Sequence, residues 1–322
     1  MTRFLIRRIV LGLVTIWAVA TLSFLLFNVA PHDPASLRLG RAASGNPQAR
    51  AQVDKELGLD KPVLTQYWIF ISHAATLNFG KSNLNNLPVT QIIGEEIPVD
   101  LSLAVGGAIL WTVLGVSVGM LAARRPRGIL DRLATVFVLT GISMPTFVLG
   151  LMLIFVFYFL LTLNGIKIFA KPGIYTPLTT NPLEWAHDLI LPWITLALIT
   201  SATYARLTRS SVLETLGEDY IRTARAKGLS ERRVVYRHGL RSALTPLVTQ
   251  FGIDFAVAIG GTIITETVFS LPGLGRQIVQ SISQQDLNVI VAIVILTTTA
   301  VVVANIVVDA LYAVLDPRVR IQ

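Results

Sequence analysis

The chain contains no cysteine among its 322 residues, so disulfides, thiolate metal sites and iron–sulfur clusters are excluded. Charge is also scarce, because only 14% of the residues are Asp, Glu, Lys or Arg, against about a quarter in soluble domains. Histidine occurs four times, without the spacing of metal ligands. A membrane enzyme would need clustered His, Asp or Glu, or a nucleophile beside a base. The scattered histidines argue against that class.

Apolar residues dominate the chain instead, at 53% of the composition and a mean hydropathy of +0.64. Runs of 18 or more apolar residues are long enough to cross about 30 Å of hydrocarbon. The first run is too long for the core of a signal peptide and predicts an uncleaved helix. Several glycines in the second run favour close helix packing. We therefore predict an all-α polytopic membrane protein with six transmembrane helices at 9–30, 101–123, 133–161, 188–208, 247–269 and 289–314.

The distribution of Lys and Arg predicts how these helices are oriented. If the N-terminus is cytoplasmic, 18 of the 27 Lys and Arg residues lie at the cytoplasmic termini and loops, which agrees with the positive-inside rule. The net charge of +8 then reflects membrane topology, and we do not expect nucleic acid as a partner. Both termini and the loop 210–245 are predicted to be cytoplasmic. The segment 31–97 is predicted to lie outside, as an ordered cap with amphipathic helices.

The loop 210–245 holds the densest charge of the chain. Its sequence predicts a helix, a break at Gly228 and a second helix, because glycine readily adopts the positive φ that ends a helix. Ser230 is expected to cap the second helix. Small residues such as Thr223, Ala224 and Ala226 would let another protein surface approach closely. The loop is therefore predicted to form a compact helical protrusion.

The run Asp219-Tyr220-Ile221-Arg222-Thr223-Ala224-Arg225-Ala226-Lys227-Gly228-Leu229 resembles the EAA loop of binding-protein-dependent ABC importer permeases. Its form is that of the dipeptide/oligopeptide/nickel branch. Further matching motifs follow in order along nearly the whole chain: Phe79-Gly80-x-Ser82, Pro88-Val89, Ile97-Pro98, Glu266-Thr267-Val268-Phe269-Ser270-x-Pro272-Gly273-Leu274-Gly275 and Asp309-Ala310-Leu311-Tyr312-Ala313-x-Leu315-Asp316-Pro317-Arg318.

The resemblance implies a permease subunit in a bacterial or archaeal cell membrane, with the type I importer fold. Residues 1–96 would hold the first helix and the outer segment, and residues 97–317 the permease core. The implied partners are a second, homologous permease, two cytoplasmic ATPases that bind ATP and Mg²⁺, and an extracytoplasmic solute-binding protein. The chain itself would hold no cofactor and catalyse no reaction. The residues implied to contact the ATPase are Asp219, Tyr220, Arg222, Thr223, Ala224, Arg225, Ala226, Lys227, Gly228 and Leu229.

The substrate implied by this branch is a dipeptide or oligopeptide. Nickel or other metal complexes and oligosaccharides remain alternatives within the same architecture. A secondary transporter is a more distant alternative, which would predict inverted repeats and discontinuous spans around an ion site. The sequence shows neither feature.

Asp254, Glu266 and Asp309 lie within the last two predicted spans, where ionisable groups usually face a cavity or a partner. Asp254 is the deepest, and we predict that it lies in the translocation pathway or forms a hydrogen bond between subunits. Glu266 is a second pathway candidate. Because Glu266 and Asp309 lie nearer the membrane interfaces, contact with a neighbouring loop or helix end is the favoured role for both.

Overall fold

The computed structural model describes residues 2–29, 47–48, 51, 55 and 61–315, and the regular structure within them is helical apart from one β-bridge between Lys81 and Pro88. The elements used below are α1 (Thr2–Phe24), η1 (Leu25–Val29), α4 (Val63–Ala75), α5 (Val89–Arg124), α6 (Ile129–Ser143), α7 (Thr146–Leu153), η2 (Ile154–Leu160), α8 (Leu161–Leu163), α9 (Pro182–Leu216), α10 (Asp219–Ala226), α11 (Glu231–Arg233), η3 (Val234–Gly239), α12 (Leu240–Gly261), α13 (Ile263–Phe269), α14 (Leu274–Gln284) and α15 (Leu287–Leu315). In the described part of the chain, five helices are long and apolar enough to cross a membrane, or up to six if α12 and α13 form one bent span.

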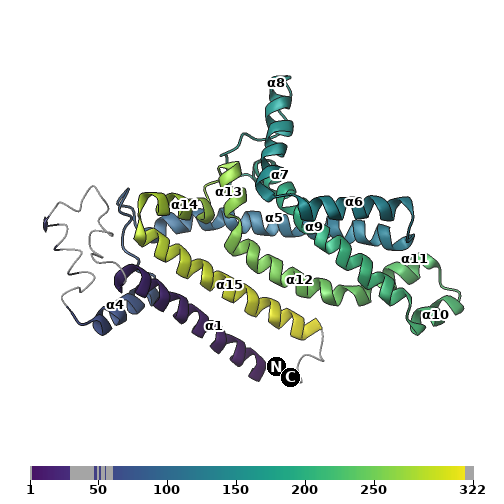
Figure 1. Ribbon diagram of the computed structural model, residues 1–322, viewed down its shortest axis with the longest axis horizontal. Coiled ribbons are helices and arrows are strands. Elements are labelled where there is room, and N and C mark those ends of the chain that lie inside the picture. Colours follow the sequence, from purple (N-terminus) through teal and green to yellow (C-terminus); the bar gives the residue numbers. More distant parts are fainter. Residues whose placement is uncertain (1, 30–46, 49–50, 52–54, 56–60, 316–322) are drawn as a thin grey trace.

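The long helices α5 and α9 lie side by side at the centre of the molecule (Figure 1). Glycines on α5 allow this approach. A Cβ added to Gly106 would lie 2.1 Å from the Trp193 ring, and one added to Gly115 would lie 2.3 Å from the Cβ of Tyr204. The expected close packing of the second span is confirmed. With 36 and 35 residues, the two helices are each roughly 50 Å long and extend beyond the hydrocarbon layer.

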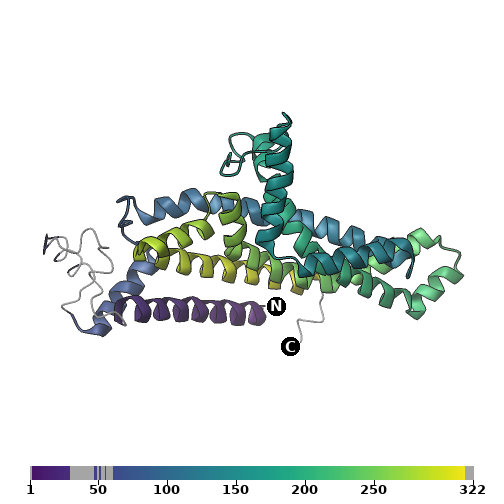
Figure 2. The same cartoon turned by 45° about the horizontal axis from the view of Figure 1, so that its top comes forward.

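The predicted third span, 133–161, is wrong as a single helix. The chain breaks at Met144, which is extended (φ −92°, ψ 122°), and Pro145 precedes a new helix. The residue before a proline avoids the helical conformation, and this explains the break. The first part, α6, packs against α9, whereas α7 packs against α9 and α13, and η2 and α8 project beyond it (Figure 2). The second part alone, Thr146–Leu163, is long and apolar enough to span a membrane.

The structure differs from two other sequence predictions, the straight fifth span and the division between residues 96 and 97. The fifth span is bent by 51° between α12 and α13. The division expected between residues 96 and 97 falls inside α5, which begins at Val89 and includes Pro98. A proline within a helix removes one backbone hydrogen bond without necessarily ending the helix, and the carbonyl it leaves free here is that of Gly94.

The outer segment contributes one described helix, α4, as the sequence predicted. Tyr67 and Phe70 of α4 pack edge-on or tilted against Phe24 of α1, with ring centroids 5.4 and 5.6 Å apart. Their cluster includes Val291 and Ile295 of α15. The other amphipathic stretch, 47–59, lies largely outside the described residues. The loop after α4 is fastened to the start of α15 through the buried Ser82 hydroxyl, which donates to Asp286.

The helices give the molecule two distinct ends. α10 and α11 project from one end, and α4 lies at the opposite end (Figure 1). α1 begins and α15 ends near the middle of the long axis, at the ends of these helices that lie away from α4 (Figures 1 and 2). α10 and α4 are therefore separated by the length of the molecule.

Candidate functional site

α10, the turn at Gly228, α11 and η3 form the protruding unit that the sequence predicted. We call residues 219–239 the docking unit, after the role proposed for it below. Gly228 has a φ of +79°, which L-residues with a side chain rarely adopt. The two halves pack through Ile221, Ala224 and Val234, which are all buried. The unit is therefore a compact helical protrusion with a small apolar core of its own.

An ion pair joins the two halves of the docking unit, α10 and α11. Arg225 donates from Nη2 and Nε to the two carboxylate oxygens of Glu231, at 2.7 and 3.1 Å. The guanidinium holds the pKa of Glu231 below its usual range. Both side chains are substantially exposed, so the pair contributes only about 0.2–1 kcal/mol. Ser230 occupies the expected cap position, but its side chain accepts no capping hydrogen bond, and that part of the prediction is wrong.

The exposed face of the docking unit carries most of the residues implied to contact an ATPase. Tyr220 is 48% exposed, and the Arg222 side chain is 74% exposed. Thr223 and Lys227 are exposed beside them. Ala224 differs, because only 8% of it is exposed and it contacts the core of the unit. Its small side chain serves the packing of α10 on η3 rather than an external surface.

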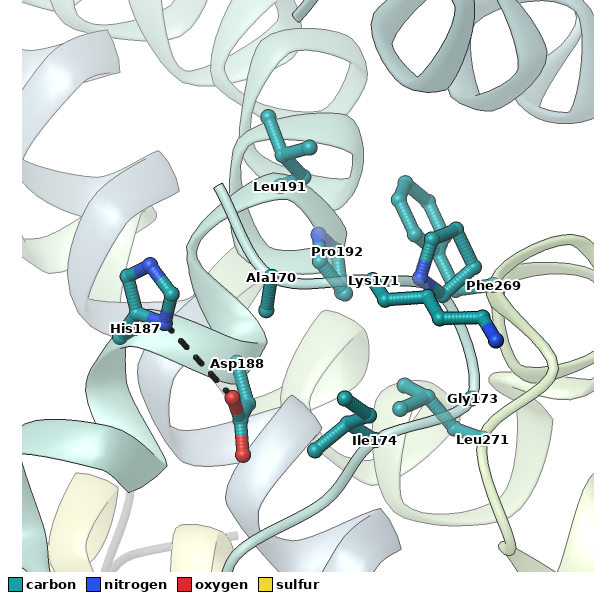
Figure 3. Close-up of a pocket in the computed structure, with 11 residues that line it drawn as sticks. Ala170, Lys171, Gly173, Ile174, His187, Asp188, Leu191, Pro192, Phe269 and Leu271 are labelled. Carbon is teal, nitrogen blue, oxygen red and sulfur yellow. Dashed lines mark ion pairs between the residues drawn. The ribbon is translucent and has the colours of Figure 1, made fainter. Parts of the chain in front are cut away.

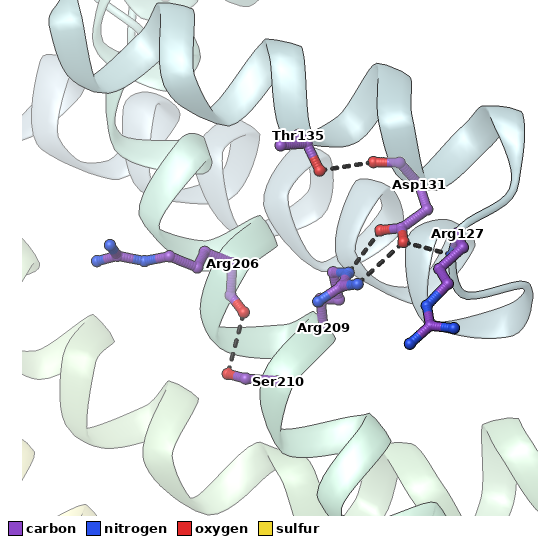
Figure 4. A network of polar contacts seen from close by, with 6 residues as sticks. All are labelled: Arg127, Asp131, Thr135, Arg206, Arg209 and Ser210. Carbon is purple, nitrogen blue, oxygen red and sulfur yellow. Dashed lines mark hydrogen bonds and ion pairs between the residues drawn. The ribbon is translucent and has the colours of Figure 1, made fainter.

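A buried carboxylate binds an arginine near the C-terminal end of α9, the end that leads into the docking unit (Figure 4). Arg209 donates from Nε and Nη2 to Asp131 of α6, at 2.5 and 2.9 Å. The backbone N–H of Arg127, whose φ is +64°, donates to the same carboxylate at 2.8 Å. The guanidinium and this N–H hold the pKa of Asp131 below its usual range. Sequence reasoning missed this anchor, since Arg209 and Asp131 were visible only as charges at the ends of spans.

Glu266 is fully buried in α13, where it holds the first turn of α14. It accepts hydrogen bonds from the Thr262 hydroxyl at 2.5 Å and from the backbone N–H of Arg276 at 3.0 Å. Asp100 of α5 accepts from the N–H of Leu274 in the same turn, at 3.0 Å. The favoured contact with a helix end is thus present for Glu266, which has no surface open to a pathway here. Asp100 was overlooked because it directly precedes a predicted span and resembled a boundary residue.

The other two intramembrane acids have different neighbours. Asp309 forms an ion pair with Arg8 of α1 at 3.0 Å, so its favoured role as a contact to a neighbouring helix is present. Asp254 is half-buried in α12 and accepts from the Gln250 side chain at 3.0 Å.

A small cavity lies under the loop before α9 (Figure 3). His187 lies 3.7 Å from Asp188, and Asp188 accepts from the N–H of Thr176 at 2.9 Å. The cavity of about 10 Å³ has room for about one water molecule, far too little for a peptide. Within the described ranges, no group of three or more His, Asp or Glu side chains is placed to hold a metal ion.

Comparison with known proteins identifies the family. Residues 115–321 match the family described as "Binding-protein-dependent transport system inner membrane component", and residues 1–104 match the N-terminal family of the same systems. The chain is 38% identical over 317 residues to the probable peptide ABC transporter permease y4tP of Sinorhizobium fredii, covering 98% of this chain and 99% of that one. It is 39% identical over 322 residues to the glutathione transport system permease GsiC of Salmonella typhimurium, with 99% of both chains covered.

A solved structure supports the fold. The inward-facing MetNI methionine ABC transporter aligns with 70% of this chain and 97% of its own, with a TM-score of 0.55 and 20% identity. The long family match and the full-length relatives together carry the assignment. The chain therefore belongs to the binding-protein-dependent transport system inner membrane components and is a permease subunit of an ABC importer, not an enzyme.

Proposed function

We propose that this permease imports peptides, as one half of a translocation pathway completed by a second, similar permease. The observation that carries the substrate class is its full-length similarity to permeases named for peptide and glutathione transport. Glutathione is itself a small peptide, so both names point to one chemical class. Nickel or other metal complexes and oligosaccharides are the alternatives.

The docking unit is the contact for a cytoplasmic ATPase in this proposal. Support comes from its shape and surface. The unit projects from one end of the bundle, and it exposes Tyr220 and Arg222 (Figure 1). This end would be cytoplasmic, and so would both termini, in agreement with the Lys and Arg distribution. Two ATPases would bind ATP and Mg²⁺, and an extracytoplasmic binding protein would deliver the peptide at the α4 end.

The chain path explains how the ATPases would act on the pathway. α9 runs into α10, and η3 runs directly into α12, so the docking unit is held by two long helices. ATP binding would bring two docking units together and move these helices, which opens the pathway to the binding protein. Hydrolysis and release of the products would restore the inward-facing state.

Substrate class is tested in proteoliposomes that contain the complete transporter and its binding protein. Labelled di- and tripeptides, glutathione, nickel with a chelator, and an oligosaccharide are offered separately, with and without ATP. We expect ATP-dependent uptake of one or more peptides. Uptake of only nickel complexes or only sugars would contradict the peptide assignment.

The absence of native cysteine permits a direct test of docking. Thr223→Cys on the exposed face should be cross-linked to the ATPase by a short bifunctional reagent. Leu84→Cys, exposed in the loop after α4, is the matched control and should not be cross-linked to it. Cross-linking of the ATPase at Leu84→Cys but not at Thr223→Cys would overturn both the docking assignment and the orientation.

A further inference from the structure

Three helices around the docking unit share a polar contact deep in their common core. α9 enters the unit, α12 leaves it, and both pack against α5. Trp111 of α5 and Tyr204 of α9 are 2% and 0% exposed. Phe251 and Phe255, which flank Asp254 on α12, pack against the buried cluster that contains Trp111 and Tyr204. The Tyr204 hydroxyl interacts with the Trp111 indole and with the Asp254 carboxylate.

Three polar atoms of these side chains have no hydrogen-bond partner in the part of the chain that the structure describes. Nε1 of Trp111, the hydroxyl of Tyr204 and Oδ2 of Asp254 are all buried, and all lie outside standard hydrogen-bond geometry. The other oxygen of Asp254, Oδ1, accepts from Gln250. Buried polar groups are nearly always hydrogen-bonded. These three atoms are therefore one another's available partners.

Their chemistry allows one order of donors and acceptors. An indole N–H only donates, an ionised carboxylate only accepts, and a phenol hydroxyl does both. When these atoms pair, Trp111 would donate to Tyr204, and Tyr204 would donate to Asp254. We call this chain of contacts the relay.

The surroundings of the relay are apolar. Ala108, Leu247 and Ala258 lie in the same buried cluster, with Phe251 and Phe255 packed against it. Tyr204 packs tightly against α5, because its Cβ lies only 2.3 Å from the position that a Cβ on Gly115 would take. In such a low-dielectric setting a completed hydrogen bond is strong and an incomplete one is costly.

We infer that the relay ties α5, α9 and α12 together, so that they move as one body when the docking unit is displaced. Asp254 is then a positioning residue, which acts as a hydrogen-bond acceptor inside the subunit rather than as a charge in the pathway. The consequence for transport rests on the proposed function, since it requires the docking unit to be the part that an ATPase moves.

Conservative substitutions separate an acceptor from a charge. Tyr204→Phe removes only the hydroxyl, and Asp254→Leu removes the acceptor. Asp254→Asn removes the charge but keeps an oxygen that can accept from Tyr204. Tyr67→Phe is the matched control, because the Tyr67 hydroxyl contacts Thr21 in the outer part of the molecule at 2.9 Å.

The measurement is the number of peptides transported per ATP hydrolysed in proteoliposomes. We expect Tyr204→Phe and Asp254→Leu to lower this ratio by about tenfold, the size of effect produced by losing one strong contact. Asp254→Asn and Tyr67→Phe should stay within about twofold of the unaltered protein. The double variant Tyr204→Phe/Asp254→Leu should be no worse than the poorer single variant, because both break one interaction.

A second readout does not depend on the ATPase. Spin labels at Ser210→Cys on α9 and Leu244→Cys on α12, both exposed, report the distance between the two helices in a chain without other cysteines. The distance distribution should broaden in Tyr204→Phe and stay narrow in Asp254→Asn and Tyr67→Phe.

Each contrary outcome has a distinct meaning. A transport ratio for Asp254→Asn as low as that of Asp254→Leu would overturn the relay and favour a pathway charge. An unchanged distance distribution and ratio in Tyr204→Phe would also overturn it. Broadening without any change in the ratio would refute the coupled motion. Failure of the proposed docking appears separately, as the absence of cross-linking at Thr223→Cys.

Discussion

Arg209 holds Asp131 through two hydrogen bonds that join α9 to α6 across 78 residues of sequence. Arg209 lies near the end of α9 that leads into the docking unit. The pair links the helix that enters this unit to the helix that precedes the break at Met144. Any displacement of the docking unit along α9 would thus reach α6 through this contact.

Removing the anchor should destabilise the permease. We expect Arg209→Ala to lower the free energy of unfolding by about 1–2 kcal/mol, a value reduced because the Arg209 side chain is partly exposed. Thermal unfolding in detergent is the measurement. Arg206→Ala is the matched control, since the Arg206 guanidinium takes no part in this contact, and an equal loss of stability in both variants would contradict the assignment.

The same ion pair predicts a pH dependence. The folded state lowers the pKa of Asp131, so the stabilisation is fully present above the pKa of the unfolded chain, about 3.9. It is lost as the pH falls through the lower folded pKa. We therefore expect the stability difference between the unaltered protein and Asp131→Asn to be constant from pH 5 to pH 7, a window chosen to lie about one unit above that value, and to shrink below about pH 4. A difference that grew on acidification would refute the sign.

The turn of the docking unit should tolerate no residue other than glycine without cost. Gly228 has open space around it but a φ of +79°, so Gly228→Ala suffers from backbone strain of about 1 kcal/mol and not from a clash. Gly228→Pro fixes φ near −65° and should abolish transport. Uptake is compared at equal permease levels in the membrane, and normal uptake by Gly228→Pro would refute the importance of the turn.

Two adjacent positions should separate folding of the docking unit from docking. Ala224 is buried against Ile221 and Val234, so Ala224→Trp should open the unit and increase its cleavage by a protease. Thr223 is exposed, so Thr223→Trp should leave the cleavage pattern unchanged and yet reduce ATP-driven uptake. Equal protease sensitivity in the two variants would show that the burial of Ala224 has no such consequence.

Gly273 should be required for the contact between Glu266 and α14. A Cβ at this position would lie 2.5 Å from the Glu266 carboxylate, so Gly273→Ala should cost about 1–3 kcal/mol. Gly94→Ala in α5 is the control, because a Cβ there meets no atom within 4 Å. A melting temperature lowered in Gly273→Ala but not in Gly94→Ala is the expected result.

Sequence patterns were sufficient for the all-helical class, the turn at Gly228 and the family, because these depend on local composition and on motifs spread along the chain. They could not pair Arg209 with Asp131 or place Tyr204 beside Asp254, since such contacts depend on how distant helices pack. The relation of Asp100 to α14 was hidden for the same reason, because its partner lies 174 residues away. The sequence showed the proline that follows the break at Met144. It did not show that this break divides the predicted span into helices with different neighbours.

The glycine contacts between α5 and α9 have a mechanical consequence. Where Gly106 and Gly115 meet Trp193 and Tyr204, no α5 side chain intervenes that could change its rotamer and let the helices slide. We expect α5 and α9 to keep the same position relative to each other during transport. The angular change of an alternating-access cycle would then be absorbed at the two interruptions in the helices, Met144 and the 51° bend beside Thr262.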